Sequence, residues 1–270
     1  MSWWVVLDAA AVDAAPSKTF SDRGDTLRAS AVMGVVMDLD LRKLRYFLAV
    51  ARQAAAQGAR VTIASSRPAS VEKALEELPG NVTGHAVDLT APPAVEELFD
   101  RVGPLDHLVF TAGEALSLMP LDDLDGELRL ARDFFTLRYF GALGAVRCAA
   151  RRIRPGGSIT LTTGSAGQRP GAGWSVAASI CGAVDALTRA LAVELAPIRV
   201  NAVSPGVVRS PLWKDMADGD REALFQATAQ SLLTGTVGEV DDVAAAYLFL
   251  LQQPFATGSV VTVDGGAALV

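Results

Sequence analysis

The sequence predicts a single α/β domain in which a parallel β-sheet is covered by helices on both faces. From Val32 onward, short runs of β-branched residues alternate with helical patterns rich in Ala and Leu. This alternation is typical of doubly wound parallel sheets. The chain has 270 residues, of which 50% are hydrophobic, so it can bury a sizeable core as one domain or as two small ones. No repeat, low-complexity linker or domain break follows Val32, which favours one domain.

The individual elements follow from local patterns. Residues 35–37 supply a first strand, and a helix over residues 49–57 ends at Gly58, which suits a helix C-cap. Later strands are expected where apolar and β-branched residues form short runs, at 60–64, 81–87, 107–110, 158–162, 198–203 and 259–263. Helices are expected where apolar residues recur at helical spacing, at 70–78, 93–101, 124–152, 173–195 and 240–251.

Residues 1–31 differ from the rest of the chain. They contain Pro16, Gly24 and several Ser and Asp residues, with little periodicity apart from the apolar run at 3–7. We expect a loosely attached or disordered arm, although Trp3 and Trp4 could instead dock on the body of the protein. The domain itself is therefore expected over residues 32–270.

The composition argues against several classes of function. The net charge of −6 argues against a nucleic-acid-binding surface over the whole chain. No run of about 20 uncharged apolar residues occurs, so no transmembrane helix is expected. The amino terminus lacks the basic segment of a secretory signal, and Cys148 and Cys181 are the two cysteines, so a reduced, cytoplasmic protein is expected. His85 and His107 lie too far apart in sequence for zinc-ligand spacing, so no metal is expected.

The distribution of glycine is uneven. The chain has 24 glycines, but only Gly24 and Gly34 precede Gly58. Glycine-rich phosphate loops usually lie near the start of doubly wound folds. The shortage therefore warns that a phosphate loop of that kind is absent.

Four motifs resemble, in order, those of the short-chain dehydrogenase/reductase family. They are Asp88-Leu89 after the strand at 81–87, Thr111-Ala112-Gly113 after the strand at 107–110, the R-V-N-A-V-S-P-G stretch ending at Gly206, and the D-G-G ending at Gly266. The resemblance covers residues 49–270. It implies a Rossmann-like fold and an oxidoreductase that binds a nicotinamide dinucleotide.

The resemblance also implies which residues contact the cofactor. They are Asp88, Leu89, Thr111, Ala112, Gly113, Pro205, Gly206 and Val208. Gly113 and Gly206 follow the carboxyl ends of strands, where doubly wound sheets bind ligands. The alternative interpretation of Pro205-Gly206 is a simple turn.

Arg67 bears on the choice of cofactor. It follows the strand at 60–64, and no Asp or Glu occurs between Arg60 and Val71. An acidic residue there would bind a ribose 2′-hydroxyl, whereas an arginine suits a 2′-phosphate. NADP is therefore favoured over NAD. The alternative is that Arg67 is a solvated residue at the end of a loop.

The active site that the resemblance implies lacks its usual chemistry. The family uses a Tyr-x-x-x-Lys pair on a helix to exchange a proton with substrate, but the matching stretch carries Trp174 and Ala178. An indole N–H is no general acid near neutral pH. Thr163 or Ser165 falls near the family's serine, at a shorter spacing than the family norm, and Arg138 falls near its asparagine. For each, the alternative to a catalytic role is ordinary helix packing or a surface charge.

The phosphate loop is the second departure. Aligned without gaps, the family's loop falls on residues 40–47, and its three glycines become Leu41, Arg45 and Phe47. Because those glycines allow close approach of the pyrophosphate, we expect cofactor binding to be weakened or lost. Residues 37–51 resemble the opening of LysR-type regulators, but no recognition helix follows. We interpret this stretch as a fusion, recombination or misassigned start, or simply as an amphipathic helix with a basic face, and the first βα unit (32–58) as atypical.

Two functional hypotheses follow. The first is an NADP-preferring oxidoreductase acting on a small carbonyl or hydroxyl compound, impaired in the family's usual mechanism. The second is a catalytically silent relative that binds a small-molecule ligand or a partner through the same cleft. Neither involves nucleic acid or a membrane. The resemblance further implies a homodimer or homotetramer formed through the helices at 124–152 and 173–195 and the C-terminal strand.

Overall fold

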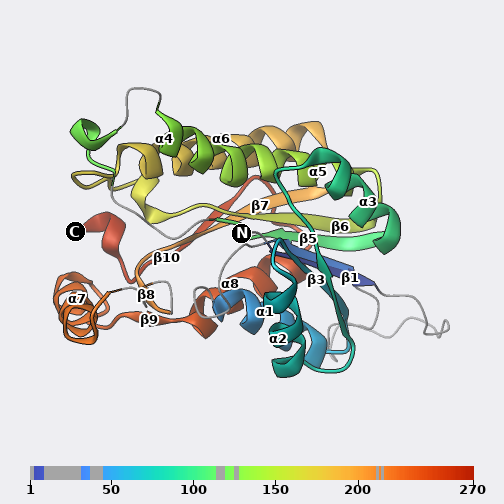
Figure 1. Cartoon of the computed structure of the whole chain (residues 1–270), viewed down its shortest axis with the longest axis horizontal. Helices are drawn as coiled ribbons and strands as arrows, with labels where there is room; N and C mark the ends of the chain where they lie inside the picture. Colours follow the sequence, from blue (N-terminus) through green and yellow to red (C-terminus); the bar gives the residue numbers. More distant parts are fainter. Residues whose placement is uncertain are drawn as a thin grey trace.

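The structure is a computed structural model that describes residues 3–8, 32–36, 45–113, 119–124, 128–210, 213 and 216–270. One parallel sheet lies between two layers of helices in a Rossmann-like fold (Figure 1). The strand order is β4 (Val82–Ala86), β3 (Arg60–Ser65), β2 (Val32–Val36), β5 (Leu105–Phe110), β6 (Ile153–Thr162), β7 (Arg199–Pro205) and β10 (Val260–Val263). The predicted doubly wound sheet is confirmed.

Helices cover both faces of this sheet (Figure 1). One layer contains α1 (Arg45–Ala56), α2 (Pro68–Glu77) and α8 (Val240–Gln252). The other contains α3 (Pro92–Val102), α4 (Arg129–Phe135), α5 (Ala142–Ala150) and α6 (Ser175–Glu194). A further helix, α7 (Asp218–Ser231), and the short pair β8 (Val208–Arg209) and β9 (Gly238–Glu239) complete the C-terminal part. The sequence did not predict α7, because Phe225 is its one fully buried residue and no apolar stripe marks it.

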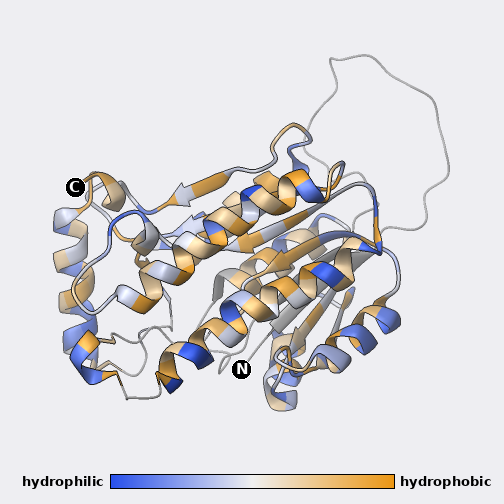
Figure 2. Cartoon of the chain, turned by 90° about the horizontal axis from the view of Figure 1, so that it is seen from above, coloured by the Kyte–Doolittle hydropathy of each residue, from blue (hydrophilic) through white to orange (hydrophobic). Residues whose placement is uncertain are grey.

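Among the described residues, α6 is the helix that is long and apolar enough to cross a membrane by length and composition alone. Its buried Val176, Ile180 and Val184 face the rest of the domain, as expected of a helix that covers a sheet. Figure 2 shows further hydrophobic residues along the long helices of this upper layer.

The long helix expected at 124–152 is interrupted. It begins at Arg129 and passes through a π-helical turn, η2 (Thr136–Gly141), before continuing as α5. A π turn holds one extra residue within the helix, and such turns are often found at functional sites. Arg138 lies within this turn.

The R-V-N motif connects β7 to the C-terminal elements. The Arg199 guanidinium donates hydrogen bonds to the carbonyl oxygens of Leu250 (2.8 Å) and Leu251 (2.9 Å) at the end of α8. The Asn201 amide donates to Ala256 O (2.9 Å) and accepts from Ser259 N (3.1 Å). Because the last carbonyls of a helix have no partner within it, Arg199 supplies a cap that also fixes α8 beneath β7.

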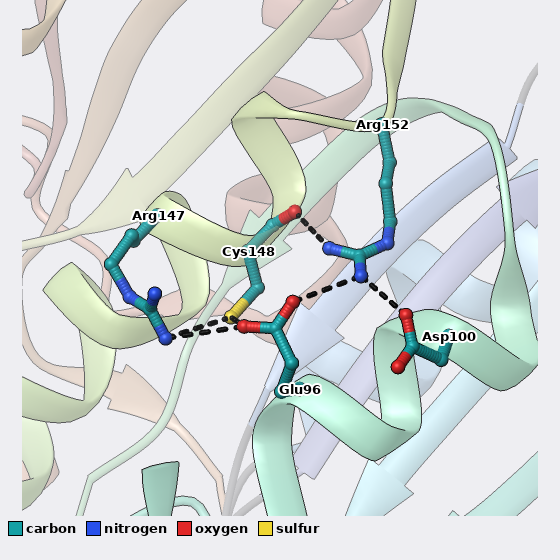
Figure 3. Close-up of polar contacts among 5 residues, drawn as sticks. All are labelled: Glu96, Asp100, Arg147, Cys148 and Arg152. Atoms are coloured by element: carbon teal, nitrogen blue, oxygen red, sulfur yellow. Dashed lines mark hydrogen bonds and ion pairs between the residues drawn. The ribbon is translucent and has the colours of Figure 1, made fainter. Parts of the chain in front are cut away.

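A polar cluster joins α3 to α5 (Figure 3). Arg152 donates to Glu96 (2.9 Å) and to Asp100 (2.5 Å), while Arg147 and the Cys148 thiol both donate to the other Glu96 oxygen at 3.2 Å. The Arg152 hydrogen bond lowers the pKa of Glu96. Burial, aided by the Glu96 carboxylate, raises the pKa of Cys148 to about 11. Cys148 therefore acts here as a hydrogen-bond donor that links two helices.

Two segments of the chain, β2 and the N-terminal β1 (Trp3–Asp8), both pair with β3 and β5. Val35 of β2 lies opposite Ile63 and Val109 in parallel register. The segment β1, within the arm expected to be loosely attached or disordered, places Val5 opposite the same two residues in antiparallel register. Because a central strand has one neighbour on each side, about 4.8 Å away, we expect one of the two segments to occupy the position between β3 and β5.

We expect β2 to hold this position in the folded domain, because β2, α1 and β3 then form a right-handed βαβ unit. A Val35→Pro substitution removes a ladder hydrogen bond from a central strand and should lower the free energy of unfolding by about 3 kcal/mol. The matched Val5→Pro substitution should change it by less than about 0.5 kcal/mol. Urea denaturation followed by circular dichroism measures both. The opposite ranking would assign the position to β1.

Candidate functional site

A pocket lies at the carboxyl ends of β5, β6 and β7, the edge at which doubly wound sheets bind ligands. Its volume is about 130 Å³. Three loops line it, those that follow these strands, together with the N-terminal half of α6 and the π turn. The lining residues are Thr111, Phe134, Arg138, Thr162, Thr163, Gly164, Ser165, Ala166, Trp174, Ala177, Ile180, Cys181, Pro205, Gly206, Val207, Val208, Ser210 and Trp213.

The structure brings many of the residues singled out in the sequence to this one pocket. Lining it are Thr111, Arg138, Ser165, Trp174, Pro205, Gly206 and Val208. Ala112 is buried behind it, and Gly113 lies against Arg138. Arg67, Asp88 and Leu89 follow β3 and β4 instead, farther along the same edge. Their roles in catalysis or cofactor binding stay predictions.

Arg138 is held in place on two sides. Its guanidinium lies over the Phe134 ring, 4.5 Å from the centroid, which is a cation–π distance. On the other side a Cβ atom on residue 113 would overlap the guanidinium, so Gly113 leaves the space that Arg138 fills. The sequence predicted that Gly113 lies at the cofactor edge. It could not predict the contact with Arg138, because the two residues are 25 positions apart and no local pattern links them.

The face of α6 that lines the pocket differs from the one expected. Trp174 immediately precedes α6 as its N-cap, and its carbonyl oxygen accepts the first hydrogen bond of the helix from Ala178 N at 2.8 Å, so the two residues lie one turn apart. The two helical residues one turn apart that line the pocket are Ala177 and Cys181, whereas Ala178 does not line it. The short spacing between Ser165 and Trp174 was the signal in the sequence that pointed to this shift of three residues.

Cys181 lies among small residues and one hydroxyl. The Thr163 hydroxyl donates to the Cys181 carbonyl oxygen at 3.0 Å, and Gly164 lies so close that a Cβ there would be 3.2 Å from the Cys181 sulfur. Burial raises the pKa of the thiol, and Thr163 and Arg138 oppose that effect only in part. Burial likewise raises the pKa of Asp185, the next acidic residue on α6. The thiol is therefore protonated near neutral pH.

Two residues that the sequence predicts to bind the cofactor follow β3 and β4. Arg67 is the N-cap of α2, and its buried Nε has no hydrogen-bond partner among the residues that the structure describes. Buried donors without partners are uncommon, and a 2′-phosphate would supply an acceptor. Asp88 accepts from the Thr90 amide (2.9 Å) and hydroxyl (2.8 Å) through one oxygen, which orients its carboxylate.

The atypical first loop lies largely outside the described residues, including Leu41 and the side chain of Arg45. Phe47 is described, and its side chain is 3% exposed within the core. Its side chain is part of the hydrophobic core, and the expected obstruction of the cofactor by this loop stays a prediction. The stretch at 37–51 is described only from Arg45, where it forms the start of α1.

Comparison with known proteins identifies relatives over most of the chain. The family model for an SDR-like Rossmann domain matches residues 30–270. The short-chain dehydrogenase/reductase ATR9 of Stachybotrys chlorohalonatus is 38% identical over 236 residues, which cover 82% of this chain and 92% of ATR9. The L-xylulose reductase of Bos taurus is 35% identical and matches 78% of this chain and 87% of its own length.

Two solved structures are similar in fold. A small-chain dehydrogenase in complex with NADPH has a TM-score of 0.67 and 38% identity, covering 72% of this chain and 91% of its own. The MalC reductase/Diels-Alderase from Malbranchea aurantiaca has a TM-score of 0.77 and 29% identity, covering 86% of this chain and 99% of its own.

The contact between Gly113 and Arg138 can be tested by a double-mutant cycle. A Gly113→Ala substitution should lower the free energy of unfolding by up to about 1 kcal/mol, because the new methyl group displaces the end of a flexible side chain from its position over Phe134. Adding Arg138→Ala should recover part of that loss. Gly182→Ala on α6 is the matched control, since its Cβ would meet nothing within 4 Å. Additive effects of the first two substitutions in urea denaturation would contradict the contact.

The thiol chemistry predicts a pH dependence of alkylation. Thiolates, not thiols, react with iodoacetamide, and a raised pKa lowers the thiolate fraction at neutral pH. Both cysteines of the native protein should therefore react slowly at pH 7.5 and faster as the pH rises, with Cys148 still mostly protonated at pH 10. Peptide mass spectrometry after timed alkylation measures each site. Rapid labelling of Cys181 at pH 7 would show that its thiol is activated.

Proposed function

The chain belongs to the short-chain dehydrogenase/reductase family of oxidoreductases, and from this premise we propose that it uses NADPH to reduce a small carbonyl compound. One observation carries the choice of cofactor. The buried Arg67 Nε at the end of β3 has no partner among the described residues, at the position where a 2′-phosphate is recognised in this fold. The NADPH complex of a similar dehydrogenase supports the same choice.

Different residues at the carboxyl edge of the sheet would contact different parts of such a cofactor. Arg67 would hold the 2′-phosphate, Asp88 and Leu89 would bound the adenine, and Thr111 to Gly113 would let the backbone approach. Pro205, Gly206 and Val208 would flank the nicotinamide end, which borders the pocket. When bound, the nicotinamide supplies the hydride. The protein supplies position, charge and exclusion of water.

We further propose that the usual proton transfer of the family is impaired. Neither alignment of α6 provides a Tyr or a Lys, because the candidate pairs are Trp174 with Ala178 and Ala177 with Cys181. Loss of a positioned general acid lowers a rate by about 10²–10⁴-fold. A guanidinium can stabilise negative charge but is not a general acid, so Arg138 cannot replace the missing phenol.

A second candidate is a silent relative that binds a ligand in the same pocket without redox chemistry. The observation that favours it is the lack of Tyr and Lys among the described residues of the pocket lining. A similar structure is named a reductase/Diels-Alderase, which is consistent with a fold of this kind holding a ligand for another reaction.

We also propose a homodimer or homotetramer. Exposed apolar residues lie along the upper helical layer, including Leu130 (49% exposed), Phe140 (60%) and Val193 (81%), and hydrophobic colour follows the same helices in Figure 2. Large apolar side chains exposed on a helical layer would be covered if two copies packed through it. Size-exclusion chromatography with light scattering would measure the mass.

Cofactor preference is tested by titrating the full chain with NADPH and NADH while following tryptophan fluorescence and thermal unfolding. NADPH should bind more tightly and raise the melting temperature. Arg67→Ala should weaken NADPH binding by about 10- to 100-fold, the value of a charged hydrogen bond, and leave NADH binding unchanged. Arg60→Ala, at the opposite end of β3, is the matched control. No binding of either nucleotide would overturn the reductase proposal in favour of the silent relative.

A further inference from the structure

We propose that the pocket takes a flat conjugated carbonyl compound, an enone, and that Arg138 binds the enolate oxygen formed when it is reduced. This inference deepens the proposed reductase function and rests on it for the hydride. Three features of the pocket carry it. They are its aromatic walls, its single fixed cation and the kind of acid that it lacks.

The walls of the pocket favour flat ligands. Trp174 and Trp213 both line it, and Phe134 lies behind Arg138. The Trp213 indole N–H donates to the Val208 carbonyl oxygen at 3.1 Å, so its orientation is fixed and its hydrogen-bonding group is already used. Large rigid rings of this kind select ligands by stacking and apolar contact.

The charge in the pocket is of one sign. Among the residues that the structure describes there, Arg138 is the one charged side chain of the lining. Phe134 lies against the guanidinium and Gly113 leaves the room that the guanidinium occupies, so the cation is already placed beside the pocket where negative charge would develop on a bound oxygen. Preorganised donors of this kind stabilise an oxyanion more than they stabilise a neutral carbonyl.

The acid requirement then selects the substrate. Hydride transfer to an isolated ketone produces an alkoxide, a strong base that needs a proton as it forms. Hydride transfer to the β-carbon of an enone breaks the C4–H bond of the dihydronicotinamide and forms a C–H bond on that carbon. The electron pair of the C=C bond moves to form the enolate, whose oxygen takes the negative charge, and NADP⁺ is left. Water later protonates the α-carbon, so no acid in the pocket is required.

The binding part of the inference is tested with an anion that resembles the enolate. The probe is 2-hydroxy-1,4-naphthoquinone, which is ionised at pH 7.5, compared with neutral 1,4-naphthoquinone of the same shape. The full chain should bind the anion at least about 10-fold more tightly. Arg138→Met should abolish that preference, whereas Arg132→Met, an exposed arginine on α4, should leave it intact. Equal binding of the two quinones by the native chain would overturn the inference.

The reaction is tested with a matched pair of substrates in the presence of NADPH. The enone 4-phenyl-3-buten-2-one should be reduced at its C=C bond, and the saturated ketone 4-phenyl-2-butanone should not react. Reduction of the saturated ketone at a similar rate, especially if Cys181→Ala abolishes it, would overturn the inference by showing that the pocket contains an acid. Failure to reduce the enone while NADPH binds would also overturn it and leave the cofactor proposal standing. Absence of NADPH binding would reject the proposed function itself.

Discussion

The carboxyl ends of β5, β6 and β7 meet at one edge because these three neighbouring strands run parallel, and the functional geometry depends on that constraint. Thr111, Thr163 and Gly206 are far apart in sequence, yet each follows one of these strands and reaches the same pocket. The constraint is maintained from the opposite layer. Arg199 caps the last carbonyls of α8, so the register of β7 and the position of the C-terminal helix are set together.

The arrangement of the pocket also depends on a glycine, Gly113, which has no side-chain methyl group at this position. Gly113 leaves room for the Arg138 guanidinium, which also stacks on Phe134. Arg138 reaches this position from a π turn, which changes the direction of side chains that follow it in the helix. The small residue on β5's loop and the irregular helix turn are therefore parts of one arrangement. Replacing either would move the only charge described in the pocket lining.

The sequence was sufficient for the sheet because β-branched runs, turn residues and the R-V-N and D-G-G motifs are local signals. It was not sufficient for α6. The sequence matched the family pair to Trp174 and Ala178, whereas the described pocket is lined by Trp174 and, from within α6, by Ala177 and Cys181. The π turn and the contact of Gly113 with Arg138 depend on packing between distant segments, which periodicity does not report. Phe47 was assigned to the phosphate loop from its spacing, and only the structure shows that its side chain is also part of the core.

A pocket whose described lining holds no Tyr or Lys need not lack reductive chemistry, because the proton that these two groups transfer is not required by every substrate. A phenol donates a proton to an alkoxide as the alkoxide forms. An enolate is a weaker base, so it can form without an acid beside it and be protonated later by water. A guanidinium can only stabilise the anion, so an active site that has Arg138 but no phenol is restricted to acceptors that delocalise charge. The restriction also explains why a raised thiol pKa at Cys181 matters. The thiol lies in the described lining, and burial makes it a weaker proton donor than an ordinary cysteine. The restriction to delocalising acceptors therefore requires that it does not protonate an alkoxide, which the Cys181→Ala comparison measures.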